Sequence, residues 1–270
     1  MRGASRASLA EAKERLAAAL ADGADPGQLG DDLFAVTGLL DAEAGLRRVL
    51  SDPTREAQAK AGLARTLLEG KIARASLDLV TAVVSERWAE PGDLPDATEQ
   101  LAVLAIVEVA DRAGQLDDVE DELFRFGRVV NAEPDLRFAL SSPFIAAERK
   151  RRLLDSLLAG KVTAPTLRLV TQAAVQGRGR SLDASLDEYA RLTAERRERL
   201  VAEVHVAIPL TAEQRGRLAA ALAAAYGRDV HLNVVVNPQV IGGMSVRIAD
   251  EIIDGSMAGR LAELRRRLAG

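Results

Sequence analysis

The chain has 270 residues and a formal net charge of −4, with 48% hydrophobic, 28% charged and 3% aromatic residues. This composition indicates two or three globular domains, and so few aromatic residues make base-stacking surfaces for single-stranded nucleic acid difficult to build. The absence of cysteine excludes disulfide frameworks, thiolate metal sites and cysteine nucleophiles. The apolar runs are short and interrupted by charges, so we expect neither a transmembrane span nor a signal peptide.

The clearest feature of the N-terminal two thirds is an internal repeat with a constant offset of 90 residues. Residues 33–81 align without a gap to residues 123–171, and 20 of these 49 positions are identical. The identities include a Leu-Ser-x-Pro, a Gly-Lys and a Leu-Val-Thr in matching places. Two units are too few for a solenoid array, so we interpret the repeat as a tandem duplication of one helical domain.

Each copy has the sequence pattern of a helical bundle. In the second copy a leucine stripe with basic residues opposite predicts an amphipathic helix that ends at Gly160, and Gly70 ends the matching helix of the first copy. The prolines that follow Ser51 and Ser141 break the preceding helices. Residues 98–113 predict an apolar helix that can close the first bundle and open the second.

From residue 200 the hydrophobic period changes. Apolar and polar residues alternate over 200–208 and again over 230–236, which predicts two strands. Between them, Thr211 and Gln214 fit a capping box at the start of a helix. Residues 244–254 predict a hairpin, and an apolar face after it predicts a last helix. The C-terminal unit is therefore expected to be β-α-β-β-β-α.

The expected fold class is mainly α with a small α+β C-terminal domain, in which two tandem helical bundles precede the β-α-β-β-β-α unit. We expect an extra helical-bundle copy at residues 1–96, a second bundle at 97–192 and the α+β domain at 199–270.

The paired glycines Gly242 and Gly243 suggest either a phosphate loop or a chain corner. A phosphate loop needs a helix N-terminus directly after the glycines, because the amides there supply the positive end of the dipole. The segment that follows, Met244 to Ile248, alternates apolar and polar residues instead and predicts a strand. We therefore favour a structural corner.

The C-terminal sequence resembles the delta subunit family of F-type ATP synthases, called the oligomycin-sensitivity-conferring protein in mitochondria. The resemblance rests on a proline, an Ile-Gly-Gly corner, an Ile-Asp-Gly-Ser turn and a leucine-bearing helix in this order. The residues that carry this motif are Pro238, Gly242, Gly243, Asp254, Gly255, Ser256 and Leu261. The resemblance covers about residues 100–270, and departs from the family in lacking a tyrosine between Leu101 and Ala110 and in having Ala249 in the hairpin turn.

This resemblance implies a non-catalytic stator component that needs no cofactor. In the family, the helical domain holds amphipathic N-terminal segments of alpha subunits, and the C-terminal domain holds the end of the membrane-anchored b subunits. It also implies a peripheral protein on the cytoplasmic face of the cell membrane. Small and aliphatic residues of the second copy either line the alpha-subunit groove or fill the bundle core: Leu101, Ala102, Leu104, Ala105, Val109, Leu169, Ala173 and Ala174.

Candidate catalytic residues are few. His205 and His231 lie on outward faces of the expected strands and have no neighbouring ligand spacing. The Gly-Lys pair at Gly160 lacks the upstream glycine of a phosphate loop. The acidic residues 117–122 suit the N-terminal turn of a helix. We therefore expect no catalytic, cofactor-binding or metal-binding residues.

Two other functions remain open from the residues alone. The duplicated bundle could be a peptide-binding adaptor or regulator unrelated to the synthase. The basic runs Arg149–Arg152 and Arg265–Arg267 could instead bind nucleic acid, although the net negative charge argues against a phosphate-binding surface and we expect no nucleic-acid partner.

The role of the first copy is a separate question. Where the second copy has Phe124-Arg125-Phe126, the first has Phe34-Ala35-Val36, and mostly small residues replace the basic run 149–152. We expect these differences to remove bulk and charge from exposed anchor positions. The sequence therefore predicts that the second copy holds the alpha segment and that the first copy acts mainly as a brace with little grip.

Overall fold

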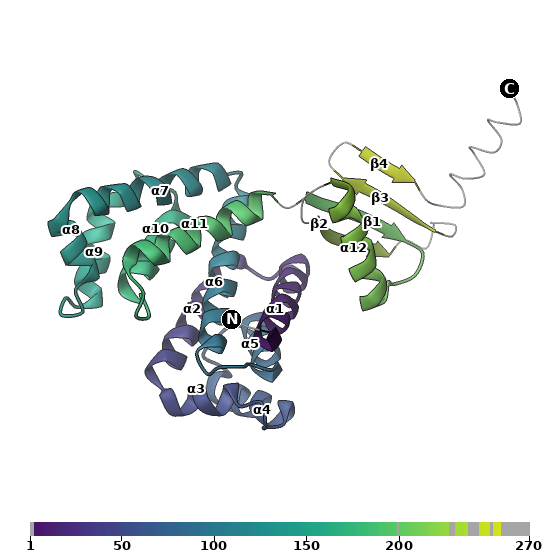
Figure 1. The fold of residues 1–270 in the computed structure, drawn as a ribbon, viewed down its shortest axis with the longest axis horizontal. Helices are drawn as coiled ribbons and strands as arrows, with labels where there is room; N and C mark the ends of the chain where they lie inside the picture. Colours follow the sequence, from purple (N-terminus) through teal and green to yellow (C-terminus); the bar gives the residue numbers. More distant parts are fainter. Residues whose placement is uncertain (1–2, 199, 227–229, 237–242, 249–250, 255–270) are drawn as a thin grey trace, which may run out of the picture. The chain divides into compact units, whose positions relative to one another are not determined.

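The computed structural model describes residues 3–198, 200–226, 230–236, 243–248 and 251–254, and the chain forms two compact units, Met1–Arg196 and Arg197–Gly270 (Figure 1). The first unit consists of helices, and the second contains a small sheet with a helix. The expected fold class, mainly α with a small α+β C-terminal part, is confirmed. The last helix of the expected β-α-β-β-β-α order lies outside the described residues.

The helices of the first unit repeat with the same offset as the sequence. The first copy contains α1 (Gly3–Ala21), α2 (Pro26–Ala42), α3 (Ala44–Ser51), α4 (Ala57–Leu68) and α5 (Arg74–Ser85). The second contains α6 (Asp93–Arg112), α7 (Leu116–Ala132), α8 (Pro134–Ser141), α9 (Ala147–Leu158) and α10 (Ala164–Val175), followed by α11 (Leu182–Glu198). Each of α2 to α5 begins and ends 90 residues before its counterpart among α7 to α10. The prediction that the copies share one fold is confirmed for these helices.

Helix α6 serves both copies. By the repeat offset α6 corresponds to α1, and α11 corresponds to α6. Helix α6 packs against α1, α2 and α5 and also against α7 and α10, so the prediction for residues 98–113 is confirmed. A continuous hydrophobic core extends from Ala12 to Leu192. The expected boundary between residues 96 and 97 therefore falls inside a helix that both copies share.

Helices α3, α4, α8 and α9 end where the sequence has a glycine or a proline. Gly70 and Gly160 follow α4 and α9 with φ angles of +74° and +71°, a left-handed conformation that glycine adopts without steric penalty. Helices α3 and α8 end at Ser51 and Ser141, ahead of the prolines that cannot continue a helix. Both predicted kinds of helix end are confirmed.

The second unit has a four-stranded sheet in the order β2-β1-β3-β4. Its elements are β1 (Leu200–Val206), α12 (Ala212–Tyr226), β2 (Val230–Val236), β3 (Met244–Ile248) and β4 (Glu251–Asp254). Strands β1 and β2 are parallel, which requires a crossover, and α12 supplies it; the other two pairs are antiparallel. Val204 lies opposite Val234 and Val246, and Leu222 of α12 belongs to the same apolar core.

Two turn predictions in this unit are confirmed. Gln214 N donates to Thr211 Oγ1 at 3.2 Å and Thr211 N donates to Gln214 Oε1 at 2.9 Å, which is the capping box of α12. Gly243 has a φ angle of +86°, and β3 begins at the next residue. Because a strand and not a helix follows, Gly243 forms a corner and has no helix dipole to offer an anion.

Candidate functional site

The eight residues expected to line the alpha-subunit groove lie on α6 and α10, and most of them are buried. Leu104 and Val109 are partly buried. The other six expose 5% of their surface or less: Leu101, Ala102, Ala105, Leu169, Ala173 and Ala174. These six side chains therefore fill the bundle core and do not line an open groove. This was the second of the two alternatives that the sequence allowed.

Helix α2 of the first copy covers this face of α6. A Cβ atom added at Gly30 would lie 2.4 Å from Ile106 Cδ1 and 3.3 Å from the Ala102 carbonyl oxygen, so a larger residue would have to displace the buried Ile106 side chain. Thr37 Oγ1 on α2 also donates to Thr98 Oγ1 on α6 at 3.0 Å. The chain's own helix therefore occupies the face that the sequence offered for a partner.

Two arginines of the second copy bind the first copy at the same face. Arg168 Nη2 on α10 donates to the Gly27 carbonyl oxygen at 3.1 Å and pairs with Asp31 on α2. Arg112 Nη2 on α6 donates to the Leu20 carbonyl oxygen at the end of α1, at 3.0 Å. These bonds hold α6 and α10 against α2 and against the end of α1.

A buried arginine connects the loop between α10 and α11 to both copies. The side chain of Arg178 is 9% exposed and pairs with Asp41 of α2 at 2.7 Å and with Asp96 and Glu99 of α6, each at 2.8 Å. Burial disfavours its charge, but the hydrogen bond to Glu99 and the nearby carboxylates outweigh burial and raise the pKa of Arg178. Arg178 has a φ angle of +52°, a strained backbone conformation for arginine that these ion pairs stabilise.

Glu99 is the centre of this network. Its side chain is 2% exposed and accepts hydrogen bonds from Arg178, Arg180 and the Tyr189 hydroxyl, the last at 2.6 Å. Burial and the negative charge of Glu99 raise the pKa of Tyr189, so the phenol stays a donor at neutral pH. Two cations and a phenol compensate this buried carboxylate, which therefore has a structural role rather than an acid/base role.

A pair of buried lysines occupies equivalent positions of the two copies. Lys60 Nζ donates to the Glu86 carbonyl oxygen at 2.7 Å, and Lys150 Nζ donates to the Ala174 carbonyl oxygen at 3.0 Å. Burial lowers the pKa of both amines. Each ammonium group satisfies a carbonyl group at the C-terminal end of α5 or α10, where cations are favoured.

Carboxylates also repeat, at the start of α5 and α10. Asp32 Oδ2 accepts from Ala73 N at 3.0 Å and from Ser76 Oγ at 2.6 Å. Glu122, 90 residues later, accepts from Thr163 N and from Thr163 Oγ1, the latter at 2.9 Å. The acidic stretch 117–122 was expected to serve one helix start; Glu122 in fact caps a different helix, α10, across the bundle.

The basic run Arg149–Arg152 does not form a continuous charged surface. Lys150 points inward to its carbonyl partner and is 7% exposed. Arg151 and Arg152 both pair with Glu148, at 3.8 Å and 3.1 Å. The second run, Arg265–Arg267, lies outside the described residues. The described part of the chain therefore gives no support to the nucleic-acid hypothesis.

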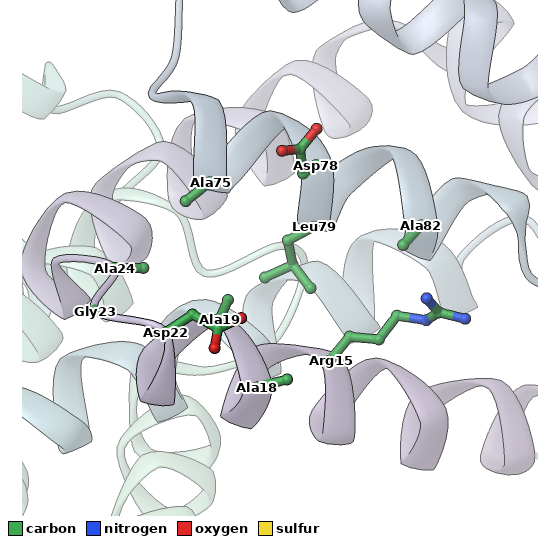
Figure 2. A pocket seen from close by; sticks show the side chains of 10 residues that line it. All are labelled: Arg15, Ala18, Ala19, Asp22, Gly23, Ala24, Ala75, Asp78, Leu79 and Ala82. Carbon is green, nitrogen blue, oxygen red and sulfur yellow. The ribbon is translucent and has the colours of Figure 1, made fainter. Parts of the chain in front are cut away.

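An open groove lies between α1 and α5 of the first copy (Figure 2). It has a volume of about 480 Å³. Ala18 of α1 and Ala82 of α5 leave room beside Leu79, and Figure 2 shows Arg15 at one end and Asp22 at the other. By the repeat offset, α1 and α5 correspond to α6 and α10. Two residues that line the groove, Ala19 and Asp78, correspond to Val109 and Arg168, which lie next to Gly27 of α2 in the second copy.

The second copy exposes large aromatic side chains. Phe124, Phe138 and Phe144 are 64%, 69% and 95% exposed, whereas Phe34, the counterpart of Phe124, is 7% exposed. The expectation that Phe124-Arg125-Phe126 supplies exposed bulk is wrong for Phe126, which is 6% exposed and belongs to the core. The period of an amphipathic helix explains the difference, because residues two apart face opposite sides.

Only part of the C-terminal motif can be placed. Gly243 forms the corner before β3, and Asp254 is the last residue of β4, opposite Ser245. The other motif residues lie outside the described residues: Pro238, Gly242, Gly255, Ser256 and Leu261.

Within the described residues, no group of three or more His, Asp or Glu side chains is arranged to hold a metal ion. None of the helices described there is long and apolar enough to span a bilayer.

The family described as ATP synthase delta (OSCP) subunit matches residues 103–268 by its sequence model. The chain belongs to the ATP synthase delta (OSCP) family. The hypothesis of a helical adaptor outside this family is therefore wrong. The match leaves the first helical copy outside it, because α1 to α5 precede residue 103.

Relatives named ATP synthase subunit delta align with this chain over its whole length, including the first helical copy. The chain is 52% identical to the ATP synthase subunit delta of Streptomyces avermitilis over 269 residues, which cover 99% of this chain and 98% of that one. It is 48% identical to the subunit delta of Thermobifida fusca over 270 residues, all of both chains. It is 49% identical to that of Kineococcus radiotolerans over 269 residues, 99% and 98% of the two chains. These alignments include the first copy.

Proposed function

We propose that this chain is the stator link of a proton-translocating F-type ATP synthase. As a member of the delta family it is a non-catalytic subunit of the peripheral stalk. The observation that carries the proposal is the full-length alignment, at 48–52% identity, with proteins named ATP synthase subunit delta. The chain acts as a peripheral protein at the cytoplasmic face of the cell membrane, within the complex.

A stator has to hold two partners at once, and the chain has two compact units to do so. We assign the helical copies, 1–96 and 97–192, to the N-terminal segments of alpha subunits on the catalytic head. We assign residues 199–270 to the C-terminal end of the b subunit. Rotor torque would otherwise turn the head, and two separate attachment surfaces on one chain resist it.

Exposed apolar residues at one end of the sheet support the assignment of residues 199–270 to the b subunit. Ile208, Val235 and Val236 are 74%, 37% and 46% exposed. Val236 pairs with Val206 at the end of parallel strands β1 and β2, and Ile208 follows β1, so these two residues lie near each other at the carboxyl ends of the strands, while Val235 faces the other side of the sheet. Exposed aliphatic side chains of this kind suit the apolar face of an amphipathic helix.

The test mixes the intact chain with a synthetic alpha N-terminal segment and a soluble C-terminal segment of the b subunit. Native mass spectrometry is expected to find one complex that contains all three. Ile208→Glu with Val236→Lys should weaken b binding by about tenfold or more and leave alpha binding unchanged, because it places charges in an apolar contact. The matched control Glu213→Lys with Arg217→Glu changes exposed charges on α12. Binding of neither segment would contradict the proposal.

A further inference from the structure

The loop between α8 and α9 corresponds to the loop between α3 and α4 of the first copy. Residues 142–146 and 52–56 follow the same sequence of turns between equivalent helices. In the first copy, Asp52 Oδ1 accepts from Thr54 N at 2.9 Å and from Thr54 Oγ1 at 2.7 Å, and Asp52 also pairs with Arg55 at 3.6 Å. This loop therefore satisfies its own polar groups and presents a polar surface to solvent.

The second copy keeps this backbone and exposes aromatic side chains on it. Phe144 takes the place of Thr54 and is 95% exposed, although its main-chain N still donates to Ser142 Oγ at 3.3 Å. On the adjoining helix α8, Phe138 takes the place of Arg48 and is 69% exposed. The first copy shows that the fold does not need phenylalanine at either position. Two large apolar side chains left in solvent near one loop are typical of an interaction surface.

Two arginines close to these phenylalanines are free to bind a partner. Arg47 of the first copy donates to two main-chain carbonyl groups at the end of α2, at 3.0 Å and 3.2 Å. Its counterpart Arg137 is exposed, and Arg149, in the first turn of α9, is also exposed and replaces Ala59. Within the described residues, neither of these two guanidinium groups has a hydrogen-bond or ion-pair partner. The second copy thus combines exposed aromatic rings with free positive charge.

The charges at this place indicate what kind of partner fits. Arginine and aromatic side chains are enriched at protein interfaces, and free arginines favour carboxylates on the other side. Asp135 and Glu148 lie in the first turns of the same two helices, α8 and α9. They repel a uniformly negative phosphate chain or lipid surface, whereas a protein segment can place its carboxylates at the arginines alone.

We propose that the α8–α9 surface, formed by Phe138, Phe144, Arg137 and Arg149, docks an acidic segment of a neighbouring protein. Apolar side chains of that segment cover the two phenylalanines, and its carboxylates pair with the two arginines. The inference rests on the proposed function in one respect, since it takes the neighbour to be another subunit of the synthase. It gives the second copy a contact of its own, although α2 covers its α6 and α10.

The first test replaces the aromatic residues by those of the first copy. Phe138→Arg with Phe144→Thr should keep the fold, because the first copy carries these residues on the same backbone. The Kd of the intact chain for synthase particles stripped of this subunit should rise by about tenfold in biolayer interferometry. The reciprocal change, Arg48→Phe with Thr54→Phe, is the matched control and should alter the Kd by less than about twofold. Circular dichroism melting curves show whether both variants keep the fold.

The second test reverses the free charges. Arg137→Glu with Arg149→Glu should raise the same Kd by about tenfold at low salt. This difference from the unmodified chain should shrink as salt is added, because exposed charges are screened. Arg48→Glu with Arg65→Glu makes the same change of net charge at exposed positions of the first copy and should have little effect.

The third test identifies the partner in the assembled synthase. A photoreactive benzoylphenylalanine at position 144 should crosslink to another subunit, at a segment with more acidic than basic residues. The same group at position 54 is the control and should give no such product.

The outcomes separate this inference from the proposed function. If the unmodified chain does not bind the stripped particles, the proposed function is wrong, and this inference is wrong with it. If the chain binds, and neither double variant of the α8–α9 surface changes the Kd, the surface assignment alone is wrong. A crosslink from position 144 to a basic segment, to lipid or to nucleic acid would also contradict it.

Discussion

The first helical copy has an open groove between α1 and α5, whereas the second copy has α2 lying over the equivalent helices α6 and α10. The helices themselves match, since α2 to α5 have the same bounds as α7 to α10 at the repeat offset. The difference therefore arises from position in the chain. The second copy shares α6 with the bundle that precedes it, so α2 of that bundle packs against it.

This comparison shows that a duplicated surface need not be a duplicated site. Arg168 and Arg112 of the second copy are used to bind the first copy, and the equivalent aspartates, Asp78 and Asp22, remain at the surface. One of the two surfaces is an internal interface, where packing and ion pairing constrain the residues, while the other is exposed to solvent.

The strongest test of the interface between the copies is Glu99→Ala. The substitution leaves Arg178 buried with less compensation and Tyr189 without its acceptor, so we expect the free energy of unfolding to fall by about 3–5 kcal/mol. Urea denaturation followed by circular dichroism measures it. Glu148→Ala, which removes two exposed ion pairs within α9, is the control and should change it by less than about 0.5 kcal/mol. Equal effects of the two variants would contradict the role of the network.

A smaller effect is expected when α2 is displaced from α6. Gly30→Val introduces a side chain where a Cβ would already lie 2.4 Å from Ile106, and we expect a loss of about 2–3 kcal/mol in the free energy of unfolding. Gly62→Val is the matched control on the exposed side of α4, where a Cβ meets open space. It should be neutral or slightly stabilising, because glycine is a poor helix former. Urea titrations that show no difference between the variants would contradict close packing of α2.

The smallest effect is expected from the buried lysines, Lys60 of the first copy and Lys150 of the second, as a dependence of stability on pH. Burial lowers the pKa of Lys60 and Lys150, so the folded chain releases each proton at a lower pH than the unfolded chain does. The unfolded state then binds more protons between the lowered pKa and the ordinary lysine value, and stability rises with pH in that window. Relative to Lys60→Met and Lys150→Met, the unmodified chain should therefore gain stability as the pH rises towards 10.5. Thermal unfolding from pH 8 to about 10.5 measures this gain. A difference that stays constant with pH would contradict it.

The regular elements could be predicted from the sequence because their signals are local. Thr211 and Gln214 are three residues apart, and Gly70 ends its helix through its own backbone conformation. Local signals could not show whether the candidate groove on α6 and α10 is open or covered. A small aliphatic residue such as Ala102 gives the same helical pattern whether a partner helix or the chain's own α2 covers it, and only the tertiary structure distinguishes the two.

The ionic network was missed for a related reason. Arg178 pairs with Asp41, 137 residues earlier in the chain, and no local pattern indicates such a pair. The repeat does contain one indication of this network. Arg178 takes the position that Trp88 has in the first copy. Trp88 is 1% exposed and donates to the Val83 carbonyl oxygen at 3.0 Å. A buried tryptophan aligned with an arginine indicates a buried cation that needs acidic partners.

Because α6 belongs to both copies, each added copy would contribute five helices and not six. Two copies occupy eleven helices between residues 3 and 198 and not twelve, because the closing helix of one copy opens the next. Each inserted copy would thus lengthen the array by five helices and 90 residues, with α1 and α11 as its end caps. Every inserted copy would have its groove covered by the α2 helix of the copy before it. Evolution could therefore lengthen this subunit and still leave only the first copy with an open groove between its first and fifth helices.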